Sequence, residues 1–488
     1  MSANGNDPLD DLLGAKRPPR NIDNALDDMT KAAATTRSAG DALDELIAGS
    51  GARPRSDVST SESDRVETRS RWSLALALAL AGVGLSGVLT ESVAASQLLG
   101  NSGPMALALV WPLGGVGLLI IAFIQSRYVD RFARLGVVRW LFIAYAAAFV
   151  VMLILFAVNI PQKVPAAIAW LLADQMNFLL PLVVWTVAGD VFTTGQGVTV
   201  FPRISRWLFG GQVVGLGIAV LAPVIFDQGD ISLTWLLVLP PVICAVTAWI
   251  LPKALATATT GLGHQREQSA TAAFRETIKL IRELPAYRWM FWVGLLAIFG
   301  GTMVDFGFLH MAQERFPDTG TLQAFYAGTS LVCFVLCWLL QTFGAAKLIN
   351  RFGVARILQL LPIGALLGTA VLVVGGTTRT VIVGSIALVL WRLPRWSIDG
   401  SARQAAMANL PDERRLRSSF VIDMGPLAIS LIVASGPIAI AAATDNLWIA
   451  PLIGLVIVVP ALFLSTRTVR TWDDTQLSYR LKRRKRLG

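Results

Sequence analysis

The stretch WSLALALALAGVGLSGVLTESVAASQL, from Trp72 to Leu98, contains a single charged residue, Glu91. A helix rises about 1.5 Å per residue, so about 20 apolar residues cross a hydrocarbon core that is roughly 30 Å thick. This stretch is therefore long and apolar enough to predict a transmembrane helix. The same criterion predicts eleven more, at 104–125, 138–158, 166–188, 207–226, 233–251, 289–310, 323–346, 355–374, 380–397, 420–443 and 447–466.

The composition of the whole chain agrees with this prediction. Hydrophobic residues occupy 54% of its 488 positions, charged residues occupy 15%, and the mean hydropathy is +0.59. A chain of this composition is expected to fold in a lipid bilayer rather than in water. We therefore expect an all-α, multi-pass membrane protein of about twelve transmembrane helices.

The charge pattern and the motifs exclude several classes of protein. The net charge of +10 is spread over short loops between apolar spans, which is typical of membrane topology rather than of nucleic-acid binding. The sequence contains no Walker-type phosphate loop, no nucleophile elbow and no His-Glu-x-x-His motif. Its three cysteines and two histidines do not have metal-ligand spacing. We expect no enzyme activity, no cofactor, no metal and no nucleic-acid partner.

Lys and Arg residues of the short loops predict the orientation in the membrane, because cytoplasmic loops carry an excess of them. The loops on one side contain Arg127, Arg131, Arg134, Arg139, Arg203, Arg206, Lys347, Arg351, Arg356, Arg414, Arg415 and Arg417. The loops on the other side contain Lys163, Arg315 and Arg379. The first side is predicted to be cytoplasmic, together with both termini, and the expected location is the plasma (inner) membrane of a bacterium.

Five segments follow from the spans and their connections. Residues 1–70 are predicted to be a disordered, acidic cytoplasmic tail that is available to a protein partner. Residues 71–251 and 289–466 each hold six predicted spans. Between them, 252–288 is predicted to carry an amphipathic surface helix, and 467–488 is a basic cytoplasmic tail. The apolar positions of the amphipathic helix are Phe274, Ile278, Ile281 and Leu284.

Three segments of the first half recur in the second half. The octet SRYVDRFA at 126–133 aligns with AKLINRFG at 346–353, and residues 185–206 align with 396–417, Trp185 matching Trp396. Gly87 and Glu91 align with Gly301 and Asp305. The offsets of 220, 211 and 214 residues lie in a narrow band, which indicates two halves related by duplication.

The repeated octet resembles the signature loop of the major facilitator superfamily, through Asp130-Arg131-Phe132 and Asn350-Arg351-Phe352-Gly353. Ser126 and Ala133 stand where that family usually has glycine. The resemblance covers about 72–466 and implies two pseudo-symmetric six-helix bundles that rock about a central cavity. It also implies that Asp130, Arg131, Asn350 and Arg351 belong to cytoplasmic gating loops. A weaker likeness, in Phe201-Pro202-Arg203 and in 410–414, is to the nucleotide-translocase-like branch of transporters.

Glu91 and Asp305 are the main candidates for a mechanistic role. Each is the only carboxylate well inside its span, and counting about 1.5 Å per residue places both roughly two-thirds of the way to the outer face. An ionisable group in hydrocarbon costs several kcal/mol, about 2.5–3.5 on insertion scales, unless it meets water or a partner. Either the pair lines a cavity and binds protons or substrate, or the two carboxylates snorkel to the outer headgroups.

Two further spans carry polar candidates. Asp174 and Asn177 share one face of the fourth span, where they either line a cavity or bond to a neighbouring helix. Arg392 lies within the tenth span and is expected to meet an anionic substrate group or to pair with Asp174. Arg395 and Asp399, four residues apart, are expected to form an ion pair.

Three functions remain open at this stage. The first is a secondary active transporter that moves a small organic solute by alternating access with protons as the coupling ion. The second is an exchanger of organic anions or nucleotides that relies on Arg392. The third is a membrane scaffold or sensor that does not transport and recruits a partner through residues 1–70.

Overall fold

The computed structural model describes residues 62–128, 134–158, 160–192, 194–228, 232–256, 282–375, 380–407, 412–444, 446 and 448–487. The chain divides into two units after Glu67, and the second unit, Thr68–Gly488, contains the membrane helices. All regular structure described in it is helical. The elements of the first half are α2 (Glu62–Ser102), α3 (Met105–Tyr128), α4 (Arg134–Ala157), α5 (Lys163–Val191), α6 (Thr194–Asp227), η2 (Leu233–Val238) and α7 (Leu239–Leu255).

The second half repeats this order with more interruptions. Its elements are α9 (Pro285–Arg315), α10 (Thr319–Phe343), α11 (Ala345–Phe352), α12 (Val354–Ile357), α13 (Leu360–Gly375), α14 (Val381–Leu393), η4 (Pro394–Asp399), α15 (Gly400–Met407), α16 (Asp412–Ala443) and α17 (Ile449–Leu487). The segment η4 is a turn of π-helix that continues α14 into α15.

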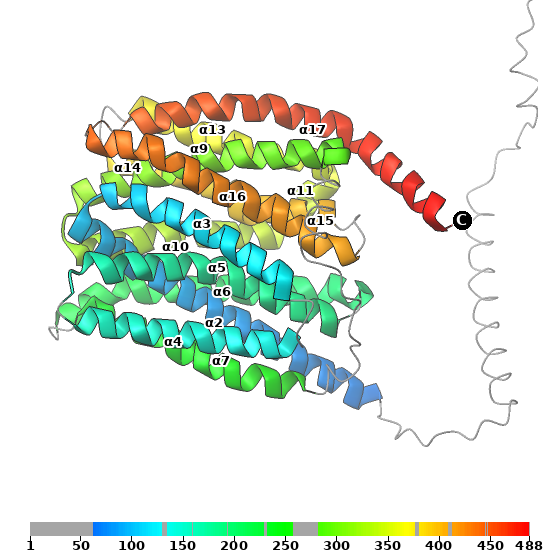
Figure 1. The fold of residues 1–488 in the computed structure, drawn as a ribbon, viewed down its shortest axis with the longest axis horizontal. Coiled ribbons are helices and arrows are strands. Elements are labelled where there is room, and N and C mark those ends of the chain that lie inside the picture. The colour runs from blue at the N-terminus through cyan, green and yellow to red at the C-terminus, as the bar shows by residue number, and fades with distance from the viewer. Residues whose placement is uncertain are drawn as a thin grey trace, which may run out of the picture. The chain divides into compact units, whose positions relative to one another are not determined.

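The expected twelve spans are confirmed within the described residues. Eleven helical runs are long and apolar enough to cross a membrane, and a shorter apolar helix, Met105–Ile121, supplies the twelfth. Figure 1 shows the long helices lying side by side, with α2 beginning and α17 ending at the same end of the bundle.

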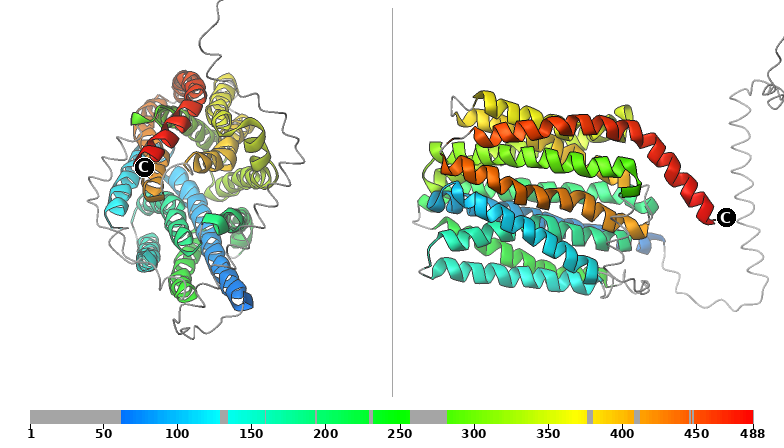
Figure 2. Two further views of the ribbon diagram at one scale, coloured as in Figure 1. Left: turned by 90° about the vertical axis from the view of Figure 1, so that its right-hand side faces the viewer. Right: turned by 45° about the horizontal axis from the view of Figure 1, so that its top comes forward.

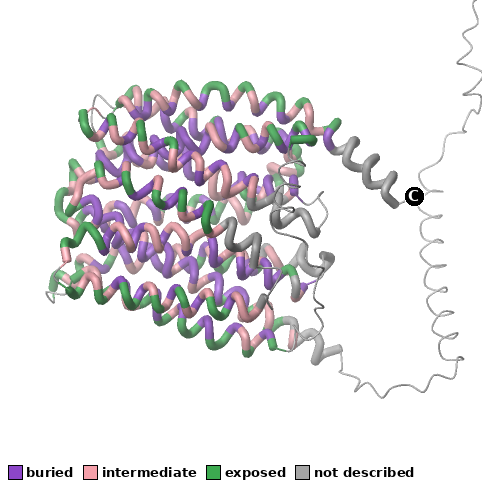
Figure 3. Tube along the Cα trace, in the orientation of Figure 1, coloured by how far each residue is buried: buried purple, intermediate pink, exposed green. Residues whose placement is uncertain are grey.

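Apolar side chains cover the outside of the bundle as well as its inside. Val374 is 80% exposed, Trp140 is 70% exposed and Phe463 is 69% exposed. Figure 3 shows that buried positions face the middle of the bundle while exposed positions face outward. A soluble protein rarely exposes so much apolar surface, so this surface is the one that lipid covers.

Two six-helix bundles make up the membrane unit, and their contacts reveal the duplication. The second helix of the first bundle, α3, packs on the fifth helix of the second bundle, α16. Reciprocally, the fifth helix of the first bundle, α6, packs on the second helix of the second bundle, α10. This exchange of positions is the pattern of a pseudo-twofold axis between duplicated halves, and the end-on view in Figure 2 shows the two groups of helices around the centre.

The two ends of the bundle differ in charge. The basic end, as we call it, carries the start of α4, the start of α6 and the short helix α11, with Arg134, Arg203 and Lys347. The opposite end carries the α2–α3, α6–η2 and α9–α10 connections, with Asp227 and Asp318.

Several predicted features lie outside the described residues, namely Asp130, Arg131, residues 1–61 and most of the predicted amphipathic helix. Of that helix, Leu284 is described, and it is 3% exposed in a protein core cluster at the start of α9 rather than on a lipid surface. Asn350 and Arg351 are exposed at the end of α11. Gly353 follows them with a φ of +80°, a conformation that glycine adopts without steric cost.

Candidate functional site

The carboxylate of Glu91 joins the two bundles. Tyr326 of α10 donates its hydroxyl to Oε1 at 2.6 Å, and Asn177 of α5 donates its amide to Oε2 at 3.2 Å. Glu91 and Asn177 belong to the first bundle and Tyr326 to the second, so one carboxylate bonds within its own bundle and across the interface. Because both oxygens are directed at protein groups on other helices, Glu91 occupies the interior of the bundle and does not snorkel.

Asp305 of α9 occupies the corresponding place in the second bundle. Trp391 of α14 donates its indole N–H to Oδ2 at 3.2 Å. Arg392, the next residue, places Nε and Nη2 each 2.9 Å from Oδ1. The guanidinium also donates to the hydroxyl of Ser330 at 3.4 Å and lies over the ring of Trp396, 4.7 Å from its centroid.

A glycine one turn before each carboxylate makes these contacts possible. A Cβ atom at Gly87 would collide with the side-chain amide of Asn177, and a Cβ atom at Gly301 would collide with the indole of Trp391. Each glycine therefore lets a polar group from the neighbouring helix approach the carboxylate. Neither position tolerates a side chain while that hydrogen bond is kept.

The two half-sites are related by the internal repeat. Gly301, Asp305 and Trp391 stand 214 positions after Gly87, Glu91 and Asn177, respectively. In each set a glycine makes room, a carboxylate accepts and a neighbouring helix donates a neutral N–H. The repeat visible in the sequence thus places two equivalent acceptor sites in the folded protein.

The two half-sites differ at the position of the arginine. Arg392 corresponds at the same offset to Phe178, so the first half-site has no matching guanidinium. Within the described residues, the ion pairs of the site involve Asp305 and leave Glu91 with neutral hydrogen-bond donors. Arg392 still lies within electrostatic reach of Glu91 and Tyr326. The duplicated site is therefore a charge pair on one side and a carboxylate with neutral donors on the other.

Asp174 completes the group of sequence candidates. It lies on α5 one turn before Phe178, faces Gly114 of α3, and is within electrostatic reach of Glu91 and Asp305. The structure brings Glu91 into contact with Asn177 and Asp305 into contact with Arg392. Asp174 lies within electrostatic reach of both carboxylates without joining either pair. Arg392 pairs with Asp305, not with Asp174 as one sequence alternative had it.

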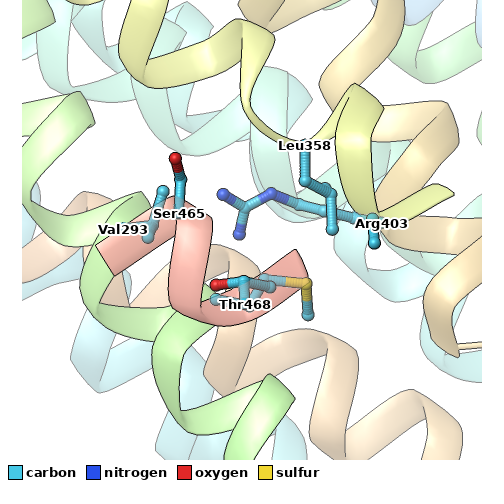
Figure 4. A pocket seen from close by; sticks show the side chains of 7 residues that line it. Val293, Leu358, Arg403, Ser465 and Thr468 are labelled. Atoms are coloured by element: carbon cyan, nitrogen blue, oxygen red, sulfur yellow. The ribbon is translucent and has the colours of Figure 1, made fainter. Parts of the chain in front are cut away.

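A second charged group lies nearer the basic end and within the second bundle. Asp399 accepts from Arg395 at 3.0 Å, which confirms the expected pair, and from Arg403 at 2.8 Å. Arg403 also approaches Asp423 of α16, at 3.7 Å. In Figure 4 the guanidinium of Arg403 extends toward α17, into a cavity of about 10 Å³. That volume holds about one water molecule at most, so this group is a packing element of the bundle.

Solved structures show which known fold the chain has. The chain has the fold of the major facilitator superfamily, whose solved members include the three transporters compared below. An auto-inhibited POT family peptide transporter matches with a TM-score of 0.59 and 10% identity, over 83% of this chain and 97% of that chain. A point mutant of the nucleoside transporter NupG matches with a TM-score of 0.54 and 14% identity, over 82% and 99%.

A bacterial homologue of the iron transporter ferroportin, in its inward-facing state, matches with a TM-score of 0.53 and 16% identity. It covers 83% of this chain and 98% of that chain. No family model and no curated protein matches the sequence. At these identities the likeness defines the fold, and it confirms the resemblance found in the repeated octet at that level.

Proposed function

We propose that this protein is a secondary active transporter that moves a small organic solute by alternating access, coupled to protons that bind Glu91. The observation that carries the proposal is the position of this carboxylate. Glu91 lies inside the bundle and bonds to Asn177 of its own bundle and to Tyr326 of the other. A proton that binds there changes a contact that must break when the bundles move apart.

The charge of the site favours this function over anion exchange. Glu91, Asp174 and Asp305 bring three carboxylates, while Arg392 is the cation and is already bonded to Asp305. Recognition of phosphate usually draws on several cations with free donor groups. A site with an acidic excess suits protons and neutral or cationic solutes, and it disfavours nucleotides. The solutes named for the similar structures, which are nucleosides, peptides and iron, show that the fold alone does not select one.

We further propose that the basic end faces the cytoplasm of a bacterial cell, across its inner membrane. The support is the uneven distribution of Lys and Arg between the two ends. In this orientation several polar contacts between the bundles lie toward the outer side. Gln313 donates to the carbonyl of Leu99 at 2.8 Å, and Ser96 donates to Gln323 at 3.3 Å. These contacts support a conformation in which the two bundles are in contact on the outer side, so that this side is closed.

The test is transport by purified protein in vesicles that enclose a pH-sensitive dye. A panel of nucleosides, dipeptides and organic amines is added outside, and solute-driven proton movement is recorded. We expect at least one solute to move protons in the wild type. We expect Glu91→Gln to lower this flux to the level of protein-free vesicles, because an amide neither binds nor releases the proton.

The matched control is Asp227→Asn, which makes the same chemical change at an exposed carboxylate at the end of α6. It should transport like the wild type. Proton-coupled uptake that survives Glu91→Gln would remove Glu91 from the coupling role. Solute movement in the wild type without any proton movement would leave a transporter that is not coupled to protons.

A further inference from the structure

Helix α10 presents a stripe of polar side chains to the first bundle and to the site. Gln323, Tyr326 and Ser330 follow one another at spacings of three and four residues, so they lie on one face of the helix. All three are at most 2% exposed. A buried polar stripe of this kind is maintained by partners on other helices, because unpaired polar groups in a membrane interior are costly.

The residues of the stripe bond to three other helices, α2, α6 and α14. Gln323 donates to the carbonyl of Ala219 in α6 at 3.1 Å and accepts from Ser96 of α2. Tyr326 donates to Glu91 of α2, and Ser330 accepts from Arg392 of α14. The stripe thus runs from the two carboxylate half-sites to the contacts of Gln323, which join the bundles near the opposite end.

Tyr326 is the member of the stripe whose hydrogen bond depends on the charge of Glu91. It meets the Glu91 carboxylate at 2.6 Å and lies within electrostatic reach of Arg392. A hydrogen bond to an ionised carboxylate is roughly twice as strong as one between neutral groups. A proton on Glu91 therefore weakens the Tyr326 bond without any transfer of the hydroxyl proton.

We propose that Tyr326 is the residue that couples the protonation of Glu91 to separation of the two bundles at the opposite end. The proposal rests on the proposed function and adds a second residue to the coupling step. With Glu91 ionised, Tyr326 holds α10 against α2, and the neighbouring Gln323 contacts stay closed. With Glu91 protonated, the weaker bond lets α10 leave α2, and that end opens more often.

Other charged and titratable groups face this pair and set the electrostatic background. Asp174 of α5 lies within electrostatic reach of Glu91, and Arg392 of α14 lies within reach of both Glu91 and Tyr326. Asp305 of α9 and Cys333 of α10 interact with Arg392. Arg392 is bound to Asp305, and Tyr326 donates its hydroxyl to Glu91. These groups form the electrostatic surroundings of Glu91, while Tyr326 converts a change in the charge of Glu91 into movement.

The experiment measures distance between the bundles without a substrate. Spin labels are placed on Asp227→Cys of α6 and Arg315→Cys of α9, both exposed at the opposite end. The three native cysteines are buried, which favours labelling of the introduced ones. Distances are recorded by pulsed electron resonance in lipid nanodiscs over a range of pH.

In the wild type, we expect the ratio of long to short distances to rise as the pH falls. Tyr326→Phe should raise this ratio at high pH by about tenfold or more, because one hydrogen bond to a charged group is lost, and should flatten its dependence on pH. Glu91→Gln should show the low-pH distances at every pH, because the amide imitates the protonated acid in charge.

Tyr287→Phe is the matched control. Tyr287 is 3% exposed and donates its hydroxyl to the carbonyl of Ala406 at 2.8 Å, wholly within the second bundle. The same substitution there should leave the pH profile unchanged. A Tyr326→Phe profile that superimposes on the wild type, or an equal change in Tyr287→Phe, would overturn the proposal.

The failure of this inference is distinguishable from failure of the proposed function. If Glu91→Gln stops proton-coupled uptake while its label distances still respond to pH like the wild type, Tyr326 is not the coupling residue and the transport function stands. Should Tyr326→Phe fail to fold, the Glu91→Gln distances alone decide, since a wild-type pH response in that variant contradicts the mechanism.

Discussion

At the scale of single residues, the ion pair of Asp305 and Arg392 is expected to contribute to the stability of the protein. Removing one partner of a fully buried ion pair costs about 3–5 kcal/mol, because the other charge is left uncompensated. The Asp305 side chain is 23% exposed, so the cost here is expected to fall below that range. Arg392→Met should lower the thermal midpoint measured by intrinsic fluorescence in detergent, and the double variant Asp305→Asn/Arg392→Met should recover part of the loss. If the double variant lost as much as the two single variants together, the two side chains would not stabilise the protein as an ion pair.

The sequence identified the residues of the site better than their partners. Each candidate was found because an ionisable or amide group inside an apolar span is costly and therefore conspicuous. Tyr326 and Ser330 were missed, since a hydroxyl is cheap in a helix and both stand in an unremarkable apolar run. Trp391 was not among the candidates. The offset of 214 residues that relates Glu91 to Asp305 also relates Asn177 to Trp391. The group that the indole N–H contacts depends on how the helix is rotated, and this rotation is known only from the structure.

At the scale of helices, the close crossing of α2 and α6 involves two glycines of α6. A Cβ atom at Gly211 would collide with the main chain of Ala81, and one at Gly215 would lie 2.7 Å from the carbonyl oxygen of Leu85. Gly217, two residues on, has no atom of another residue near its missing side chain. The four glycines of this span, Gly210, Gly211, Gly215 and Gly217, predict close packing from the sequence; the structure confirms it for Gly211 and Gly215, and the prediction is wrong for Gly210 and Gly217.

This difference gives a prediction with its own control. Gly211→Ala should separate the helices and lower the thermal midpoint, because main-chain atoms cannot move aside as a side chain does. Gly217→Ala should be neutral or slightly stabilising, since alanine is better than glycine in a helix by about 1 kcal/mol. Both variants are compared by thermal unfolding and by size-exclusion profile after heating. Equal behaviour of the two would mean that the α2–α6 distance is not fixed by Gly211.

At the scale of the whole molecule, hydrophobic length was enough to predict the number of spans, and the internal repeat was enough to predict two halves. It was not enough to predict their interruptions. The predicted span 380–397 corresponds to α14 and most of a π-helical turn at Pro394–Asp399, and the helix then continues beyond it as α15. Proline removes a main-chain donor there, and buried Asp399 gathers Arg395 and Arg403 around the turn. The pairing of α3 with α16 and α6 with α10 is set by packing between distant segments, on which a local apolar pattern carries no information.

The division of the chain after Glu67 allows transport to be separated from recruitment of a partner. Removal of residues 2–65 takes away the acidic segment and no more than the first four residues of α2, while Glu91, Tyr326, Asp305 and Arg392 all remain. Because the contacts that define the site lie wholly within Thr68–Gly488, the truncated protein should keep the solute-driven proton flux of the full chain.

Flux in vesicles and growth of a deletion strain carrying either form are measured together. Full flux with lost growth would assign the tail a separate recruiting role, whereas lost flux in a well-folded truncated protein would contradict a self-contained transport unit. Growth restored by the truncated chain but not by Glu91→Gln would place the cellular function in the membrane unit itself and exclude the scaffold.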